Sequence, residues 1–281
     1  MMQRNVSTML GCDADFDSAA SVLFGAPMDM TTSFRPGARF GPSAMRELSF
    51  GMETYSPYQD KDLTDIAVMD SGDLELPMGD AAAALGMIEE RAAIILNHGK
   101  RPVMLGGEHL VTLGAVRAAA KKHPDLHILH FDAHADLRED YLGVKLSHAC
   151  VIRRCQEILG DGRIYQFGIR SGDREEFIWG KSHVHTRLFD FGGLDEVIAH
   201  LKDKPVYLTI DLDVLDPAVF PGTGTPESGG VDFISLLGAI RSVCRLNIVA
   251  ADLNELCPDR DHSGASTMVA LKILRELLLA F

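Results

Sequence analysis

The sequence lacks long hydrophobic runs. No stretch of its 281 residues approaches the roughly 18 uninterrupted apolar residues of a membrane-spanning helix. The segment Met1–Asp17 contains no apolar core and no small-residue cleavage site, so we expect no secretory signal. The five cysteines are odd in number and scattered, without a Cys-x-x-Cys pair. We therefore expect reduced, mostly buried thiols in a cytoplasmic protein.

Basic residues are also scarce, since 27 Lys and Arg stand against 40 Asp and Glu for a formal net charge of −13. This balance argues against nucleic acid as a partner, because phosphate binding needs a basic face. It is compatible with a small cationic substrate, which a negative field would attract. The chain shows no repeat, low-complexity run or long linker, and its 46% hydrophobic content is ample for a large core. We predict a single domain over residues 1–281.

Short β-rich runs alternate with helix-like stretches throughout the chain. Several runs are continuously apolar, which is typical of strands covered on both faces. We expect strands at Val22–Phe24, Ile66–Met69, Pro102–Leu105, Leu126–Phe131, Arg163–Gly168, His183–Leu188, Val206–Ile210 and Ile248–Asp252. We expect helices at Pro42–Phe50, Asp80–Asn97, Leu110–Lys122, His148–Leu159, Leu194–Lys202, Phe233–Val243 and Ala265–Leu279. The alternation predicts an α/β fold with a mostly parallel, eight-stranded sheet sandwiched between helices.

Polar clusters follow four of these strands at the points where the apolar runs stop. The clusters are Gly106-Gly107-Glu108-His109, Asp132-Ala133-His134-Ala135-Asp136, Asp211-Leu212-Asp213 and Asp252-Leu253-Asn254-Glu255. Parallel α/β sheets place their ligands beyond the carboxyl ends of the strands. We therefore expect the four clusters to meet in one cleft.

Alternation along an extended chain makes one of these clusters compact. Asp132, His134 and Asp136 occupy positions i, i+2 and i+4, so their side chains point the same way past two small alanines. Asp211 and Asp213 repeat the i, i+2 spacing on another strand. The sequence thus predicts four carboxylates and an imidazole facing one spot.

His109 could reach the same spot from its glycine-rich turn, because Gly106 and Gly107 allow tight backbone paths. Four aspartates and two histidines cannot stay ionised together unaided, since close carboxylates raise each other's pKa. Two divalent cations would balance the four negative charges, and an oxygen-rich set with imidazole suits Mn²⁺. We interpret His130, which lies inside its strand, as a buried, hydrogen-bonded histidine rather than a ligand.

The motifs together resemble the ureohydrolase family, which includes arginase, agmatinase, guanidinobutyrase and formiminoglutamase. The resemblance rests on residues 35–42, 106–109, 131–136, 147–148, 211–217, 222–226 and 229–230. It spans nearly the whole chain and implies the arginase-type three-layer α/β/α fold, with a dimanganese centre. Among the members of the family, the sequence is most like the bacterial agmatinases.

The resemblance also implies a ligand set. One manganese would be held by His109, Asp132, Asp136 and Asp211. The other would be held by His134, Asp132, Asp211 and Asp213, with Asp132 and Asp211 bridging. Ions held by shared carboxylates generate a bridging hydroxide.

Three further roles follow from the resemblance and from the chemistry of a guanidinium, which is a poor electrophile and stays cationic at neutral pH. Glu255 matches the carboxylate that orients this group through paired N–H bonds. Asp136 would protonate the leaving amine after hydroxide attack. His148 matches the histidine that exchanges protons with bulk water; the alternative is an ordinary histidine at a helix start, capped by Ser147.

The substrate prediction depends on the loop Leu137–Gly143, which lacks the Asn- and Ser-rich set of arginases. Glu139 and Asp140 in this loop would disfavour a substrate carboxylate and favour a free amine. We therefore predict that agmatine and water give putrescine and urea, within polyamine metabolism. The closest alternative is another guanidino substrate such as 4-guanidinobutanoate, whose acid group Arg138 or Arg170 would bind.

Two alternatives come from other classes: a non-catalytic, metal-stabilised binding protein, and an amide hydrolase of the related deacetylase type. The complete ligand set, Glu255 and His148 argue against the first, and the paired-metal aspartate set with Glu255 argues against the second. The resemblance further implies a homo-oligomer, either a trimer or a hexamer.

Overall fold

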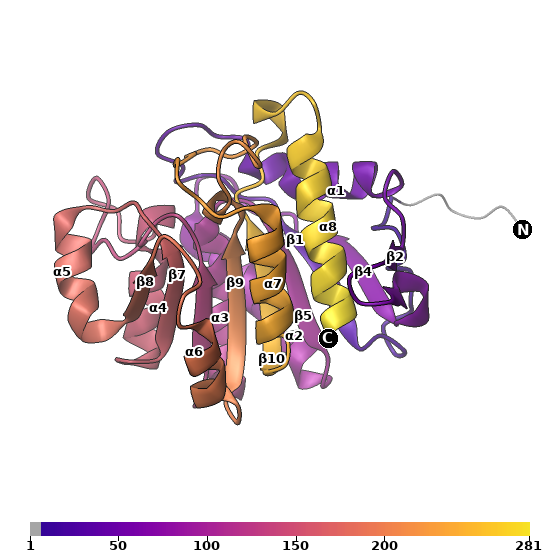
Figure 1. The fold of residues 1–281 in the computed structure, drawn as a ribbon, viewed down its shortest axis with the longest axis horizontal. Helices are drawn as coiled ribbons and strands as arrows, with labels where there is room; N and C mark the ends of the chain where they lie inside the picture. The colour runs from indigo at the N-terminus through magenta and orange to yellow at the C-terminus, as the bar shows by residue number, and fades with distance from the viewer. Residues whose placement is uncertain (1–6) are drawn as a thin grey trace, which may run out of the picture.

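The molecule is built around one central β-sheet (Figure 1). The computed structural model describes residues 7–281, so the first six residues of Met1–Asp17, where we expect no secretory signal, lie outside the described residues. Eight strands form one sheet in the order β4-β1-β5-β10-β9-β6-β7-β8, and all seven pairings are parallel. Among residues 7–281, no helix combines the length and apolar character needed to cross a membrane. The predicted α/β fold is confirmed.

All eight predicted strands are present, and five of them are two or three residues longer than expected. They are β1 (Ser21–Ala26), β4 (Val68–Asp73), β5 (Arg101–Gly106), β6 (His127–Phe131), β7 (Ile164–Ile169), β8 (His185–Leu188), β9 (Pro205–Asp211) and β10 (Asn247–Asn254). Every residue of β1, β6 and β7 is buried. Their continuous apolar runs therefore reflect helices on both faces of the sheet.

Helices cover both faces and complete the three layers. One face carries α2 (Ala81–Asn97), α3 (Thr112–Lys122), α4 (Val151–Leu159) and α5 (Arg174–His183). The other carries α1 (Gly41–Ser49), α6 (Leu194–Leu201), α7 (Phe233–Val243) and α8 (Ala265–Ala280). Figure 1 looks onto this second face, with α6, α7 and α8 in front of the strands. Seven of these eight helices were predicted.

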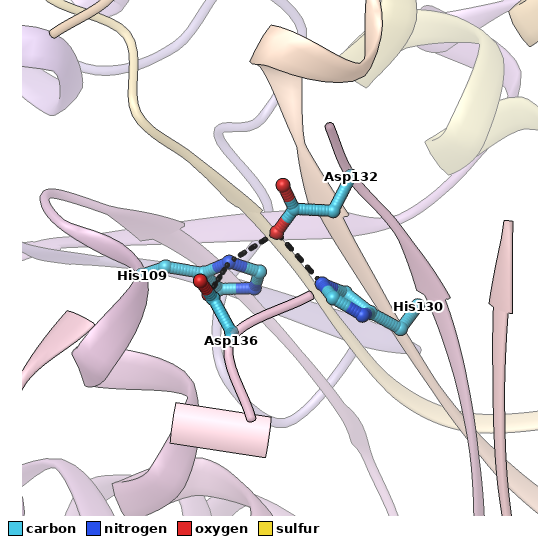
Figure 2. A group of neighbouring side chains, drawn as sticks. All are labelled: His109, His130, Asp132 and Asp136. Carbon is cyan, nitrogen blue, oxygen red and sulfur yellow. Dashed lines mark hydrogen bonds and ion pairs between the residues drawn. The ribbon is translucent and has the colours of Figure 1, made fainter. Parts of the chain in front are cut away.

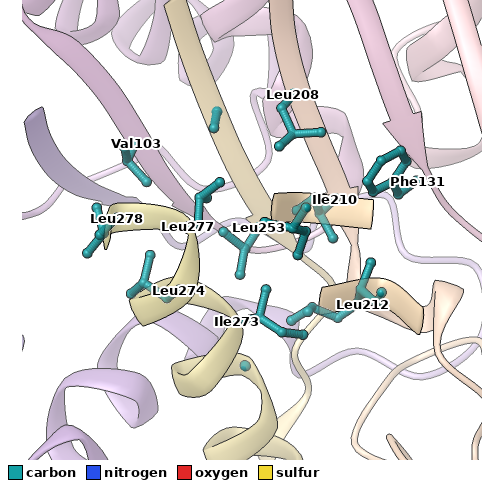
Figure 3. Close-up of a cluster of buried hydrophobic side chains, with 14 of the residues drawn as sticks. Val103, Phe131, Leu208, Ile210, Leu212, Leu253, Ile273, Leu274, Leu277 and Leu278 are labelled. Carbon is teal, nitrogen blue, oxygen red and sulfur yellow. The ribbon is translucent and has the colours of Figure 1, made fainter. Parts of the chain in front are cut away.

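The core on the second face fixes the central strands (Figure 3). Ile210 of β9 and Leu253 of β10 lie against Leu274 and Leu277 of α8, and all four side chains are buried. Burying an aliphatic side chain of this size contributes about 1.5–3 kcal/mol. The carboxyl ends of β9 and β10, which carry the polar clusters, are thus held in place by apolar packing against α8.

Helix α5 and a β-hairpin were not predicted, and one predicted strand begins later than expected. The expected strand His183–Leu188 is wrong at its start, because His183 ends α5 and β8 begins only at His185. Helix α5 begins with a capping box in which Asp173 accepts from the Glu176 N–H and the Glu176 side chain accepts from the Asp173 N–H. It buries only Glu176 and Gly180, so it lacks the apolar stripe that reveals a helix. The other omission is a two-stranded hairpin, β2 (Tyr55–Ser56) with β3 (Lys61–Asp62).

Candidate metal centre

Four neighbouring strands, β5, β10, β9 and β6, bring the predicted clusters together at one edge of the sheet. His109 begins a short 3₁₀ turn, η3 (His109–Val111), directly after β5. Asp211 is the last residue of β9, and Asp213 lies in the following turn η5 (Leu212–Val214). Asp132 comes immediately after β6. The six predicted metal residues therefore converge, as the strand-end rule requires.

The first half of the centre surrounds one nitrogen of His109 (Figure 2). The Nδ1 atom lies 2.9 Å from Asp132 Oδ2, 3.2 Å from Asp136 Oδ2 and 3.3 Å from Asp211 Oδ2. All four residues are buried. Three carboxylates from two segments thus converge on one imidazole nitrogen away from solvent.

The tautomer of His109 follows from its other nitrogen. Thr209 Oγ1 donates its proton to Asp252 Oδ1 at 2.6 Å, so it accepts the Nε2–H of His109 at 2.8 Å. This leaves Nδ1 as a bare lone pair, and within residues 7–281 this buried atom has no hydrogen-bond partner. Burial opposes a proton on His109, but Asp132, Asp136 and Asp211 more than offset it and raise the pKa of His109 well above its usual value. The geometry therefore favours a cation at Nδ1.

The second half of the centre surrounds His134. Its Nδ1 lies 3.0 Å from Asp213 Oδ2 and 3.5 Å from Asp132 Oδ1. Asp213 is held in place because its Oδ1 accepts from the Ala133 N–H at 3.2 Å, while its own N–H donates to Asp211 Oδ1 at 2.9 Å. The side chain of His134 is 24% exposed, against 1% for His109. Asp132 joins the halves, since its Oδ2 faces His109 and its Oδ1 faces His134.

His130 is also close, but its hydrogen bonds give it another role. Gln166 Nε2 lies 3.0 Å from His130 Nδ1, so that nitrogen accepts and Nε2–H donates to Asp132 Oδ2 at 2.7 Å. Figure 2 shows the His130 ring on the far side of Asp132 from His109. The interpretation of His130 as a buried, hydrogen-bonded histidine is confirmed, and it supports Asp132 as a second-layer donor.

The pKa values of Asp132 and Asp211 shift in opposite directions. Burial raises the pKa of Asp132, but the imidazoles of His130, His109 and His134 outweigh it and hold that pKa well below its usual value. Burial and the charge of Asp213 raise the pKa of Asp211 well above its usual value. Clusters around both His109 and His134 bring ligand atoms within 4.8 Å of one another. Such carboxylate and imidazole donors fit divalent cations.

Glu255 lies beside the centre in a strained conformation. Its Oε1 accepts the His109 N–H at 2.8 Å, and Oε2 makes no hydrogen bond within residues 7–281. Its φ is 65°, and that of Asp136 is 54°, a left-handed region that costs a residue with a side chain of order 1–2 kcal/mol. Burial raises the pKa of Glu255 to about 8. A cationic group beside Oε2 would restore its ionised form.

A hollow of about 230 Å³ adjoins the centre and is lined in part by His134, Asp136 and His148. His148 begins the 3₁₀ turn η4 (His148–Cys150) before α4. Its Nε2 lies 3.1 Å from Ser33 Oγ, and burial lowers the pKa of its imidazole. The ring is therefore neutral at pH 7 and able to accept a proton.

The mouth of this hollow carries two acids and one base. Arg138 pairs with Asp173 at 2.7 Å and with Glu176 at 3.5 Å, and its guanidinium lies over the Tyr141 ring at 4.9 Å. All four residues line the hollow. The two acidic side chains outnumber the single arginine, so the charge of the mouth favours a cationic group over an anionic one.

Two acids predicted to recognise the substrate, Glu139 and Asp140, do not line the hollow. Glu139 pairs at 2.7 Å with both Lys145 and Arg153, and Asp140 accepts the Gly143 N–H at 2.9 Å. The prediction that these acids favour an amine is wrong, because their side chains turn toward neighbouring cations and their own turn.

Arg170 is likewise unsuited to bind a substrate acid. Its guanidinium donates to the backbone carbonyls of Gly168, Asp213, Val214, Leu215 and Glu227. These bonds occupy its donors and fix the loop after β9. Arg170 is therefore a structural clamp beside the centre.

The sequence analysis missed other residues at the same edge. Thr31 and Ser33 follow β1, Asp173 follows β7, and Glu108 precedes His109. Strands β1 and β7 end at the edge where the metal residues lie, so the strand-end rule applied to every strand would have found three of them. For Glu108, no sequence pattern separates a buried carboxylate from a solvated one.

Comparisons with known proteins add independent information. A family model described as the arginase family matches residues 19–280. The agmatinase of Bacillus subtilis is 49% identical over 271 residues, covering 95% of this chain and 93% of that protein. A guanidinobutyrase of Pseudomonas aeruginosa is 33% identical over 283 residues, covering 94% and 87%.

Solved structures agree with these sequence matches. The agmatine ureohydrolase of Thermoplasma volcanium superimposes with a TM-score of 0.90 at 35% identity, covering 99% of this chain and 94% of that one. The predicted resemblance and the three-layer architecture are thereby confirmed.

Proposed function

The chain belongs to the arginase family, and we propose that it is a dimanganese hydrolase that cleaves agmatine to putrescine and urea. The observation that carries the metal-dependent part is the bare Nδ1 of His109, which faces three carboxylates without a donor. Only a cation, either a proton or a metal ion, relieves that arrangement. The agmatinase relatives support the substrate.

The ligand sets expected from the sequence fit this geometry. One ion would be held by His109, Asp132, Asp136 and Asp211, and the other by His134, Asp132, Asp211 and Asp213. When bound, two such ions supply a water molecule acidic enough to ionise near neutral pH. Hydrolysis adds one water molecule to the guanidinium carbon, breaks the bond to the alkyl-bearing nitrogen, and transfers a proton to the departing amine.

The protein's own groups orient the substrate and move the protons. The free Oε2 of Glu255 would accept N–H bonds from the guanidinium, which in turn stabilises the carboxylate form of a residue whose pKa is raised by burial. Asp136 lines both the centre and the hollow, so it would carry the proton to the leaving amine. The neutral His148 would exchange that proton with bulk water.

The distal end of the substrate would lie near the mouth of the hollow. Asp173 and Glu176 outnumber Arg138 there, and Arg170 is fully engaged by backbone carbonyls. A distal ammonium, as in agmatine, would be attracted to this mouth, whereas the carboxylate of 4-guanidinobutanoate would be repelled. The charge of the mouth thus supports agmatine over the acid.

The test is a comparison of substrates after the protein has been stripped of metal with a chelator. With Mn²⁺ restored, we expect urea from agmatine at a higher kcat/KM than from 4-guanidinobutanoate or arginine. Bound manganese should reach two ions per chain by elemental analysis. If agmatine is the poorest of the three, the substrate assignment fails; if no guanidino compound is cleaved, the protein is the non-catalytic homologue.

We further propose that the enzyme works in the cytoplasm as a homo-oligomer, a trimer or a hexamer, and produces putrescine for polyamine metabolism. Light scattering of the purified protein distinguishes these assemblies from a monomer. The substrate would be a small cationic guanidino compound, with neither nucleic acid nor membrane as a partner.

A further inference from the structure

The loop Met28–Ser33, which follows β1, packs directly on the glycine turn that carries His109. A Cβ atom placed on Gly107 would lie 2.0 Å from the Met28 carbonyl oxygen, so only glycine fits there. The Glu108 N–H donates to that same oxygen at 2.7 Å. The loop and the metal-centre turn are thus joined backbone to backbone.

The side chain of Glu108 strengthens this joint. It is completely buried, and its Oε2 accepts the Thr31 N–H at 2.8 Å while its Oε1 accepts the Thr31 hydroxyl at 2.9 Å. Thr32 adds a weaker bond from its hydroxyl to Oε2 at 3.3 Å. A buried carboxylate needs such donors, so Glu108 fixes the position and the hydroxyl orientation of Thr31.

Thr31 in turn contacts His148. Because its hydroxyl proton goes to Glu108, its oxygen accepts, and the His148 N–H donates to it at 3.0 Å. The preceding residue, Ser147, makes no capping hydrogen bond with its side chain. The alternative of a histidine capped by Ser147 therefore lacks its hydrogen bond, and the His148 N–H is satisfied instead by Thr31, from 117 residues away. Ser33 holds the other end of His148 through ring Nε2.

We propose that Thr31, locked by Glu108, is a positioning residue that sets the place of His148 in the reaction. The inference rests on the proposed function for the role of His148, but the contact between the two residues is tested separately. The three residues form a continuous path from the turn of His109 to the proton-exchanging imidazole. Thr31 and Ser33 are therefore the two residues of the Met28–Ser33 loop that reach the active site, through His148.

The decisive variant is Thr31→Val, which keeps the shape of the side chain and removes only the hydroxyl. We expect kcat to fall by about 10-fold to 100-fold, because a misplaced proton-transfer group loses much of its contribution. KM should stay within about twofold, since the substrate-orienting Glu255 is untouched. Bound metal should remain at the wild-type level, and Thr31→Ser, which restores the hydroxyl, should recover most of the rate.

Thr32→Val is the matched control, because Thr32 bonds Glu108 at 3.3 Å but makes no hydrogen bond to His148. It should keep nearly wild-type kcat. Ser33→Ala, at an exposed position where folding is not at risk, should lower kcat by a few-fold through the ring contact.

Hydrogen exchange provides a readout that does not depend on activity. The amide of His148 should exchange faster in Thr31→Val than in the wild type or Thr32→Val, because only that variant loses its acceptor. Unchanged exchange at His148, an unchanged kcat in Thr31→Val, or an equal loss in Thr32→Val would each overturn the proposal. If the wild-type protein cleaves no guanidino compound, the proposed function fails, whereas the exchange result still decides whether Thr31 holds His148.

Discussion

The protein buries two groups of charges in opposite ways. Arg46, packed between α1 and the sheet, gives two hydrogen bonds to Asp70, at 2.7 and 3.0 Å, and a further one to Asp73. Asp70 also accepts the N–H groups of Met9 and Gly72, so neither partner in this pair lacks a counter-charge or a donor. The buried pair of Arg275 and Glu276 is arranged similarly.

The metal centre holds four aspartates without any arginine or lysine paired to them within residues 7–281. The side chains nearest to them are the imidazoles of His109, His130 and His134, and Nδ1 of His109 has no hydrogen-bond partner within residues 7–281. The difference shows that charges which stabilise the fold are neutralised inside the chain, whereas charges which do chemistry are left for a ligand to neutralise.

The largest effect should come from Asp132→Ala, since Asp132 faces both halves of the centre. We expect loss of both ions and a fall in urea release of at least about 10³-fold, equal to roughly 4 kcal/mol of transition-state stabilisation. Elemental analysis and steady-state kinetics measure the two losses. The metal-free variant should also be less stable than metal-free wild type, because the His130 Nε2–H and the His134 N–H lose their acceptor. Full activity in this variant would mean that the site is misassigned.

The matched change at the other site is Asp70→Asn, which leaves Arg46 buried and only partly paired. We expect the free energy of unfolding to fall by about 3–4 kcal/mol, as when one member of a buried pair is removed. Urea denaturation measures it. Manganese content and kcat per folded molecule should not change. A loss of bound metal in this variant would contradict the separation between the Arg46–Asp70 pair and the metal centre.

Metal addition should stabilise only through the centre. Restoring Mn²⁺ to stripped protein at about 100 times its Kd should raise the free energy of unfolding by about 2.7 kcal/mol. The same increment should appear in Asp70→Asn and vanish in Asp132→Ala. Thermal unfolding with and without the ion gives the result, and an increment that survives in Asp132→Ala would place the ions elsewhere.

The smallest effect concerns Asp261, a carboxylate neutralised by neither cation nor metal. It accepts from the N–H and hydroxyl of Ser263 and of Ser266 at the start of α8. Burial opposes its charge, but these bonds outweigh burial and lower its pKa to about 2, from 3.8. Its contribution is therefore present above pH 4 and is lost as pH falls through about 2.

Asp261→Asn should cost about 1 kcal/mol at pH 7, and the difference from wild type should shrink between pH 4 and pH 2. Denaturant unfolding at several pH values checks this. A difference that grows as pH falls would contradict the assignment of the shift to the folded state.

Much of this architecture is readable from sequence because burial on both sides of a sheet leaves a strong pattern. The runs that became β6 and β9 are apolar up to Phe131 and Ile210, and the acids begin at the next residue. Alternation then aims Asp132 and Asp136 together. What the pattern cannot give is an interaction between distant segments, such as Glu108 with Thr31, or the direction of an exposed side chain such as Glu139.

Helix α5 is another feature that the sequence pattern does not predict. Its first turn is specified by a capping box at Asp173, but its faces are mostly exposed, so no apolar periodicity predicts the helix.

For Arg170, the sequence predicted the location correctly but not the role. It does lie beside the centre, yet its donors are consumed by carbonyl groups that no linear pattern identifies.

Strand β10 has a consequence for how the enzyme is made in a cell. It lies between β5 and β9, so without it the sheet is two pieces, β4-β1-β5 and β9-β6-β7-β8. His109 belongs to the first piece and the aspartates to the second. Since Asn247–Asn254 follows both pieces in the chain, we expect the proposed ion site that joins His109 to the aspartates to form only after β10 has been synthesised. Occupancy of that proposed site would thus report on whether the two pieces of the sheet have been joined.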